Sequence, residues 1–335
     1  MNWKAIFSFG GRVLLSGILA GVILTGFCYF YYNMPVRIAD ADGATDYRWE
    51  PNTFYCRGTE GFAWGRTNNE GYLNPTDFLP ESGTDILVMG SSQMEGYQVE
   101  QKESAASRLD ALLPEDRVYN IGVSGHTFPI CVSNLEAAIK KYQPAKYVVM
   151  ETDRIRFSDE ELIQVLEGTV AEIASYSGGI VGLLQKNPYL RLAYSQMQSF
   201  AERTGDGVAE ENVAVASGQT TSDEGLLSAF FEKIETIARA GQVRVIVLYH
   251  PGITVREDAT IQLNRDLEAV QQFRRLCTEH GITLLDMSER FVQEYEASRI
   301  LPYGFTNSSV GNGHLNKYGH GMIADELYQR IKEGA

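Results

Sequence analysis

The chain has 335 residues, 44% of them hydrophobic, which is enough apolar material for one large α/β domain together with a membrane anchor. Its 29 Lys and Arg residues stand against 43 Asp and Glu residues, which gives a formal net charge of −14. Because this charge repels phosphate backbones and no run of basic residues offsets it, the composition argues against nucleic acid as a partner.

The first predicted element is a run of 20 uncharged residues, 13–32. This length matches the roughly 20 residues that a helix needs to cross the hydrocarbon core of a bilayer. A cleaved signal peptide is the alternative, but the run is longer than the usual apolar core of about 7–15 residues, and no Ala-x-Ala site follows it. We therefore predict an uncleaved signal anchor. Residues 1–12 are expected in the cytoplasm and the following domain outside it, at a bacterial-type cell membrane, because a large domain behind a single early anchor usually translocates.

Residues 33–82 follow the anchor and are rich in turn formers and aromatic residues, as in the segment 68–75. We interpret them as an amino-terminal extension that packs beside the functional site. A plain turn with a packed tyrosine is the competing interpretation of the Asn-Gly-Tyr region.

Residues 83–335 are predicted to form the main domain, in which apolar strands alternate with amphipathic helices. We expect strands at 85–90, 117–122, 146–151, 243–249 and 282–286, and helices near 103–113, 130–142, 226–240, 261–279 and 317–332. Such alternation predicts a three-layer α/β/α sandwich around a five-stranded parallel sheet with the flavodoxin-like order 2-1-3-4-5. Residues 158–224 interrupt it and are interpreted as a helical cap and a mobile loop, which either shape an acceptor groove or form an insertion without function.

A serine follows the first strand at the sheet edge where open α/β folds bind their ligands. The strand 86–89 leads into Gly90, Ser91 and Ser92, and a second segment with His314 returns near the end of the chain. Taken alone, Gly-Ser-Ser is also an ordinary turn in which a serine caps a helix. Together, the two segments indicate a serine hydrolase in which Ser92 is the nucleophile and His314 its base.

The segments resemble the blocks of the SGNH (GDSL-like) hydrolase superfamily, in the same order. Residues 90–97 are similar to the Gly-Asp-Ser block with Ser91 in place of the aspartate, residues 120–127 to the glycine block, and residues 313–320 to the histidine block. The matches span residues 84–331. The resemblance implies the SGNH hydrolase fold, serine-ester chemistry, and an oxyanion hole formed by the backbone amides of Ser92 and Gly125.

Two positions depart from this family pattern. Thr152 aligns with the asparagine of the third block, and its hydroxyl could still donate a hydrogen bond to an oxyanion. Gly311 stands where the family has the aspartate that orients the histidine. A Ser–His dyad remains possible, with the imidazole held by a backbone carbonyl, by Asn312 or by Asp286 after the last strand.

Three further residues are predicted near the substrate. His126 replaces the aspartate common after the glycine of the second block, Asp153 follows the third strand, and His250 ends the fourth. These residues lack the close His-x-x-x-His or Cys-x-x-Cys spacing that would fix a metal ion, so we expect no metal and no cofactor.

Three functions fit these observations. The first is an extracytoplasmic esterase that removes acetyl groups from a cell-surface carbohydrate. The second is an O-acyltransferase of a surface polysaccharide, which the resemblance to membrane-anchored members of the superfamily implies. This enzyme would need a multispanning acyl-transporting membrane partner. The third is a catalytically silent binding or assembly protein, because two family positions have changed.

Overall fold

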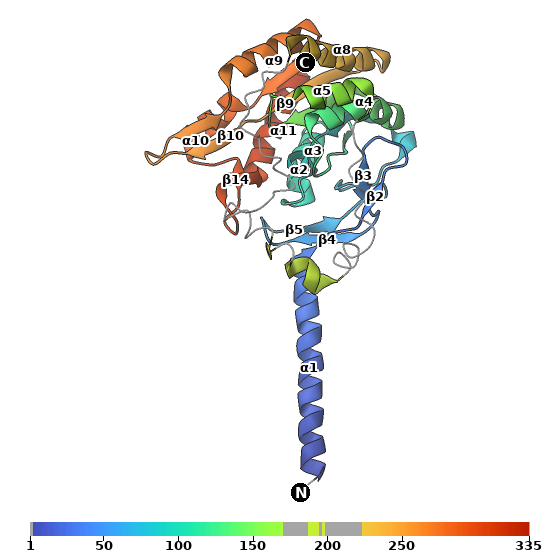
Figure 1. Ribbon diagram of the computed structural model, residues 1–335, viewed down its shortest axis with the longest axis vertical. Helices are drawn as coiled ribbons and strands as arrows, with labels where there is room; N and C mark the ends of the chain where they lie inside the picture. The colour runs from blue at the N-terminus through green and yellow to red at the C-terminus, as the bar shows by residue number, and fades with distance from the viewer. Residues whose placement is uncertain (1–2, 170–186, 194–195, 198–222, 335) are drawn as a thin grey trace.

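The computed structural model describes residues 3–169, 187–193, 196–197 and 223–334. Its most distinct feature is the first helix, α1 (Trp3–Tyr31), which projects as a single rod from the folded domain (Figure 1). The segment Phe9–Tyr31 has a mean hydropathy of 2.1, is 6% buried, and is long and apolar enough to cross a membrane. Most of the apolar side chains of this segment are exposed and are suited to lipid.

The main domain is organised around a parallel sheet of five strands. In spatial order these are β12 (Thr283–Asp286), β9 (Arg244–Tyr249), β8 (Pro144–Thr152), β6 (Thr84–Met89) and β7 (Val118–Asn120). All four neighbouring pairs run parallel, so the predicted order 2-1-3-4-5 is confirmed. The strands are short apolar runs because a parallel sheet is covered on both of its faces.

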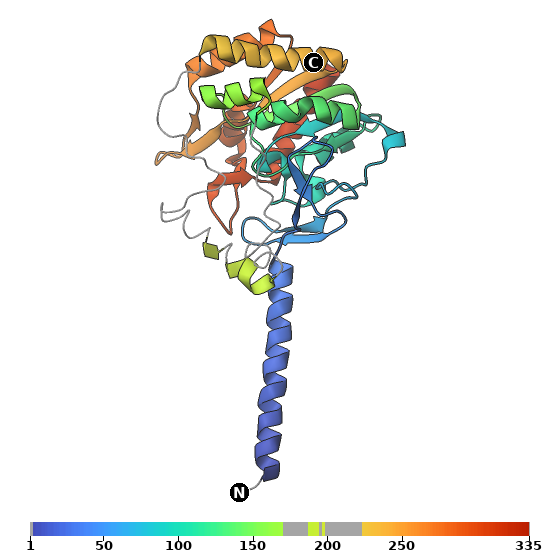
Figure 2. The same ribbon diagram turned by 45° about the vertical axis from the view of Figure 1, so that its right-hand side comes forward.

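Helices cover the sheet in two layers (Figures 1 and 2). Alternate strand residues set the two faces: Leu87 and Met89 belong to one buried cluster, and Ile86 and Val88 to the other. The first face packs against α4 (Phe128–Tyr142), α5 (Asp159–Glu167), α8 (Glu224–Ala240) and α9 (Leu267–Glu279). The second packs against α3 (Ala105–Leu112), α10 (Ser288–Ser298) and α11 (Lys317–Lys332). The three-layer α/β/α sandwich that the sequence predicts is therefore present.

One predicted helix, 261–279, was wrong in its first part. Residues Ile261–Asn264 form strand β11, which pairs antiparallel with β10 (Gly252–Val255). The helix begins only at Leu267, because the Asp266 carboxylate accepts hydrogen bonds from the amides of the first turn, at 2.9 and 3.1 Å. Leu267, the first residue of the helix, is 60% exposed.

The extension contains two small antiparallel sheets. One has the order β1-β4-β5, from β1 (Tyr32–Asn33), β4 (Phe54–Arg57) and β5 (Ala63–Arg66), and the other pairs β2 (Arg37–Ala39) with β3 (Tyr47–Trp49). β1 continues directly from α1, so the first sheet lies at the domain end of that helix (Figure 1). A second hairpin on the far side of the site joins β13 (Tyr303–Gly304) to β14 (Val310–Leu315). The short helical turns are η1 (Pro80–Ser82), α2 (Ser92–Glu95) and η2 (Gln101–Glu103).

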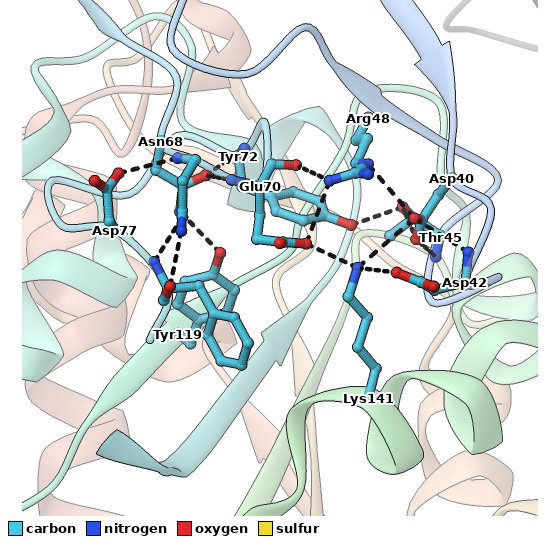
Figure 3. A network of polar contacts seen from close by, with 12 residues as sticks. Asp40, Asp42, Thr45, Arg48, Asn68, Glu70, Tyr72, Asp77, Tyr119 and Lys141 are labelled. Carbon is cyan, nitrogen blue, oxygen red and sulfur yellow. Dashed lines mark hydrogen bonds and ion pairs between the residues drawn. The ribbon is translucent and has the colours of Figure 1, made fainter. Parts of the chain in front are cut away.

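A polar network fixes the extension to the sandwich (Figure 3). Lys141, in the last turn of α4, lies 2.8 Å from a carboxylate oxygen of both Asp42 and Glu70. Asn68 donates a hydrogen bond of 2.8 Å to the Tyr119 hydroxyl of β7 and accepts the backbone amide of Tyr72 at 2.9 Å. The Asn-Gly-Tyr segment therefore joins the extension to the domain.

The predicted insertion can be followed in part. Its beginning forms α5, whose Ser158 and Glu161 make a capping box. The predicted mobile loop, apart from Asp223, lies outside the described residues.

Candidate active site

Ser92 lies at the first position of α2, one short turn after β6. Ser91 caps this helix, since its hydroxyl accepts the amide of Gln93 at 3.2 Å. Gly90 makes the turn possible because an added Cβ atom would lie 2.6 Å from a carboxylate oxygen of Glu151. The sequence therefore places the Ser92 hydroxyl at the carboxyl edge of the sheet, 8% exposed.

A buried carboxylate accepts hydrogen bonds from the residue before Ser92. One oxygen of Glu151, in β8, accepts hydrogen bonds from the Ser91 amide at 2.7 Å and from the Ser91 hydroxyl at 2.9 Å. Its other oxygen lies 2.8 Å from Nε2 of His250, whose Nδ1 lies 2.8 Å from the Tyr303 hydroxyl. Ser91, which stands where the resemblance leads one to expect aspartate, thus takes a carboxylate partner from the neighbouring strand.

His314 faces Ser92 from the opposite side. It lies in β14, and its Nε2 is 3.0 Å from the Ser92 hydroxyl oxygen. Gln93 joins the two segments, because its side-chain oxygen accepts the backbone amide of Leu315 at 2.8 Å. The structure thus brings the two predicted residues within hydrogen-bonding distance, although 222 positions separate them.

The partner of the imidazole is Glu60, a residue that the sequence analysis missed. One oxygen of Glu60 lies 2.7 Å from Nδ1 of His314, and the other accepts the backbone amide of His314 at 3.0 Å. The two side chains predicted for this role lie elsewhere. The Asn312 side chain accepts the amide of Gly313, and Asp286 binds Arg274 and accepts the backbone amide of Ser288, the first residue of α10. No local pattern marks Glu60, because it reaches the site from the extension.

The electrostatics of this pair set the state of the histidine. Burial opposes the charge on Glu60, but the hydrogen bonds and charge of His314, together with Arg57, hold the pKa of Glu60 at about 2. An ionised carboxylate only accepts hydrogen bonds, so Nδ1 of His314 must carry the proton. In neutral His314, Nε2 then presents its lone pair to the Ser92 hydroxyl, which is the arrangement of a serine triad.

The turn that carries Glu60 is held by Asn307. Its side-chain nitrogen donates to the carbonyl oxygens of Gly58 at 2.9 Å and Gly61 at 2.7 Å, and its oxygen accepts the Gly61 amide at 2.9 Å. Gly313 leaves room for the carboxylate, because an added Cβ atom would lie 2.6 Å from it. The acid is therefore fixed from both the loop before β14 and from β14 itself.

The glycine block packs against α2, the helix that carries Ser92. Gly125 has a φ of +87°, and the preceding Ser124 donates its amide to the buried carboxylate of Glu95 at 3.1 Å. Glu95 belongs to α2, so the same short helix carries Ser92 and fixes the Gly125 turn. Among the described residues, no hydrogen-bond acceptor is found for the backbone amides of Ser92 and Gly125, which leaves both available for an oxyanion.

Thr152 does not present its hydroxyl proton to Ser92. The hydroxyl donates to the carbonyl oxygen of Arg154 and accepts the Arg154 amide at 3.3 Å, within a local turn. The expected oxyanion contact is therefore replaced by a turn contact.

The remaining predicted residues differ in access to solvent. His126 is 2% exposed and His250 is fully buried, so neither can touch a substrate in this structure. Burial, assisted by Arg37, lowers the pKa of His126 to about 3. Asp153 reaches solvent at the end of β8. Among the described residues, no group of three or more His, Cys, Asp or Glu side chains could hold a metal ion.

Comparisons with known proteins find similarity in structure alone. No family model and no curated sequence matches the chain. An acetyl xylan esterase is 13% identical with a TM-score of 0.43, and covers 74% of this chain and 99% of its own. A psychrotrophic esterase from a Pseudoalteromonas species, inhibited by monoethylphosphonate, is 15% identical with a TM-score of 0.38, over 75% and 97% of the two chains. A member of the lipolytic G-D-S-L family from Veillonella parvula is 14% identical with a TM-score of 0.39, over 75% and 99%. The solved structures that this chain is similar to are therefore esterases and GDSL-type hydrolases.

Proposed function

We propose that this chain is an SGNH-type serine esterase that removes acyl groups from a carbohydrate at the cell surface. The observation that carries the proposal is the chain of contacts Ser92–His314–Glu60, with distances of 3.0 and 2.7 Å. These three side chains come from three separate segments, and their order of hydrogen bonding is that of a nucleophile, its base and the acid that orients the base.

In the first half-reaction, Nε2 of His314 takes the proton of the Ser92 hydroxyl while Oγ attacks the ester carbonyl. The backbone amides of Ser92 and Gly125 stabilise the resulting oxyanion. The intermediate collapses as the carbon–oxygen bond to the sugar breaks, and protonated His314 gives its proton to the leaving sugar oxygen. Glu60 stays ionised throughout and stabilises the imidazolium.

In the second half-reaction, water attacks the acyl-serine. His314 again accepts a proton, now from water, and returns it to Ser92 as the carboxylic acid leaves. A sugar hydroxyl could replace water in this step without any change in the residues involved.

The acyltransferase is therefore the second candidate. The feature that favours it is α1, which would keep the domain beside a membrane where an acyl-transporting partner could deliver the donor. The silent binding protein is disfavoured, because a protein without chemistry has no need for the paired contacts of Glu60 with His314.

Reactivity of Ser92 can be tested on the full-length chain in detergent micelles with a fluorophosphonate probe. We expect one covalent adduct, located on Ser92 by peptide mass mapping, and loss of the adduct in Ser92→Ala and His314→Ala. Thr127→Ala, which removes a hydroxyl outside the proposed machinery, is the matched control and should label as wild type. A folded wild-type protein that stays unlabelled would overturn the esterase.

Water and sugar acceptors can be separated with an O-acetylated oligosaccharide as donor. Release of free acetate with or without a second, non-acetylated oligosaccharide supports the hydrolase. Acetyl groups that appear on the added oligosaccharide, with little free acetate, would replace the hydrolase with the transferase.

A further inference from the structure

One face of the β4–β5 hairpin contacts the last turn of α1. Antiparallel pairing places Cys56 opposite Trp64 and Phe54 opposite Arg66, so these four residues share one face. The opposite face points into the domain, where the Tyr55 ring lies 4.8 Å from that of Tyr97. The hairpin thus has one face toward the domain and one face away from it.

The face turned away from the domain is the one that meets α1. The ring of Phe54 stacks on Tyr29 with centroids 5.4 Å apart, and the Cys56 thiol donates to the carbonyl oxygen of Phe30 at 2.8 Å. Both partners belong to the last turn of α1. These contacts turn this face toward the side on which α1 leaves the domain. β4 and β5 lie at the domain end of that helix (Figure 1).

The remainder of this face is exposed and carries two aromatic side chains and one cation. Phe62 and Trp64 are each 62% exposed, and Arg66 follows at the next outward position of the same strand. A soluble surface gains nothing from two large exposed aromatic side chains at alternate positions. Aromatic rings with a neighbouring cation are typical of the membrane–water interface.

A second segment reaches α1 independently. The Tyr189 hydroxyl donates to the carbonyl oxygen of Gly21 at 3.1 Å. Gly21 lies ten residues before the end of α1 at Tyr31, which is about 15 Å along a helix axis. If Phe9–Tyr31 spans a bilayer, this contact lies below the bilayer surface. Tyr189 and Leu190, 38% and 46% exposed, would then meet lipid.

We infer that Phe62, Trp64 and Arg66 form a collar beside the outer end of α1 that binds the bilayer interface, and that Tyr189 and Leu190 meet lipid deeper along the helix. The occupant is a lipid surface because the collar is continuous with the helix that would enter it. Arg66 would lie at the level of the lipid phosphates, and the aromatic rings beside the upper acyl chains.

The collar also bears on the source of the substrate. This part of the inference rests on the proposed function. The turn between β4 and β5 carries Glu60, two residues before Phe62. A hairpin seated on lipid would hold the candidate acid at the membrane surface, so that the acylated carbohydrate would be taken from a membrane-associated carrier or layer.

Tryptophan fluorescence tests the collar without using activity. The chain has three tryptophans, of which Trp49 is buried and Trp3 lies at the other end of α1. In a Trp3→Phe background, full-length protein is placed in vesicles of phosphatidylcholine and phosphatidylglycerol with bromine atoms on the upper acyl chains. The Trp64 signal is obtained as the difference between this protein and its Trp64→Phe variant.

We expect bromolipid to quench at least half of the Trp64 emission and to leave Trp49 unchanged. The matched control is Leu112→Trp in the Trp3→Phe, Trp64→Phe background, because Leu112 ends α3 at the opposite edge of the sheet and is 39% exposed. Quenching of Trp64 no greater than that of the Leu112→Trp control would overturn the inference. Fluorophosphonate labelling of the same samples reports separately on Ser92, so failure of either proposal leaves the other measurable.

Discussion

Glu60, in the turn of an amino-terminal hairpin, accepts a hydrogen bond from Nδ1 of His314, although 254 positions separate the two residues. The contact supplies the acid that the histidine segment lacks, because that segment has Gly311 where the family pattern has an aspartate. It also makes the extension part of the site, because the carboxylate cannot reach the imidazole unless β4 and β5 are packed against the domain.

Replacement of the acid should lower the rate while leaving the nucleophile in place. We expect Glu60→Gln to reduce kcat for an ester substrate by about 10²–10⁴-fold, because the imidazole loses its preferred tautomer and its imidazolium is no longer stabilised. Asp286→Asn, which changes the other acid predicted for this role, should keep a rate near wild type. Steady-state kinetics on an aryl acetate compares them, and equal losses in both variants would contradict the assignment.

Two glycines of β14 offer a matched pair. Gly311 and Gly313 have φ values of +82° and +93°, so alanine strains the backbone at both positions. Only at Gly313 would the new Cβ atom meet the Glu60 carboxylate, at 2.6 Å. We expect Gly313→Ala to lower kcat by at least tenfold relative to Gly311→Ala. The idea fails if the two variants lose the same activity and the same stability.

Asn307 should act on the rate through Glu60. Loss of its three hydrogen bonds in Asn307→Ala, each worth about 0.5–1.5 kcal/mol, would free the hairpin turn and reduce the fraction of molecules with Glu60 in contact with His314. We expect kcat to fall with little change in KM. Asn312→Ala serves as the control, because the Asn312 side chain is exposed and accepts the amide of its neighbour Gly313. A change confined to KM would assign Asn307 to substrate binding instead.

The buried carboxylate beneath the nucleophile turn should matter for folding. Glu151→Ala would leave the Ser91 amide and His250 without their partner in a site where Glu151 is 1% exposed. Breaking such a buried pair costs about 3–5 kcal/mol of the free energy of unfolding. Glu151→Gln keeps an acceptor for Ser91 and should cost less. Urea unfolding measures both, and a wild-type midpoint in Glu151→Ala would show that the pair carries no stability.

We expect two buried histidines to lower the stability of the folded protein in weak acid. Burial lowers the pKa of His126 and of His320 to about 3, with nearby cationic groups adding to the effect. Between pH 3 and the ordinary value of 6.5, the unfolded chain binds protons that the folded chain does not, so stability falls as the pH falls through this window. Each histidine contributes about 1.4 kcal/mol per pH unit at most.

His320→Gln separates this effect from other acid titrations. Nδ1 of His320 accepts the Ala105 amide at 3.2 Å, and a glutamine oxygen can take over this contact without binding a proton. The difference in unfolding free energy between pH 7 and pH 5 should therefore be smaller in the variant than in wild type. An unchanged difference would mean that His320 is protonated in the folded protein.

The sequence alone determined the parts of this protein that depend on local pattern. Apolar runs at regular intervals gave the five parallel strands and their order, because a covered parallel sheet needs continuous hydrophobic strands with helices between them. The same argument placed Ser92 at the carboxyl edge of the sheet. The resemblance of residues 313–320 to the histidine block placed His314 beside it, and the structure brings the two residues to 3.0 Å. The uncharged run near the start gave the helix that is apolar enough to span a membrane.

Only the tertiary structure decided which carboxylate meets His314. Glu60 has no special neighbours in the sequence, and its role arises from the packing of a hairpin that Asn307 holds from a distant loop. A turn to Arg154 engages the Thr152 hydroxyl. Packing buries His126 and His250, although the block position of His126 and the strand end at His250 had suggested access to substrate. Residue type and spacing specify which elements form and which edge they share. The direction of a side chain at that edge depends on long-range contacts that no local pattern records.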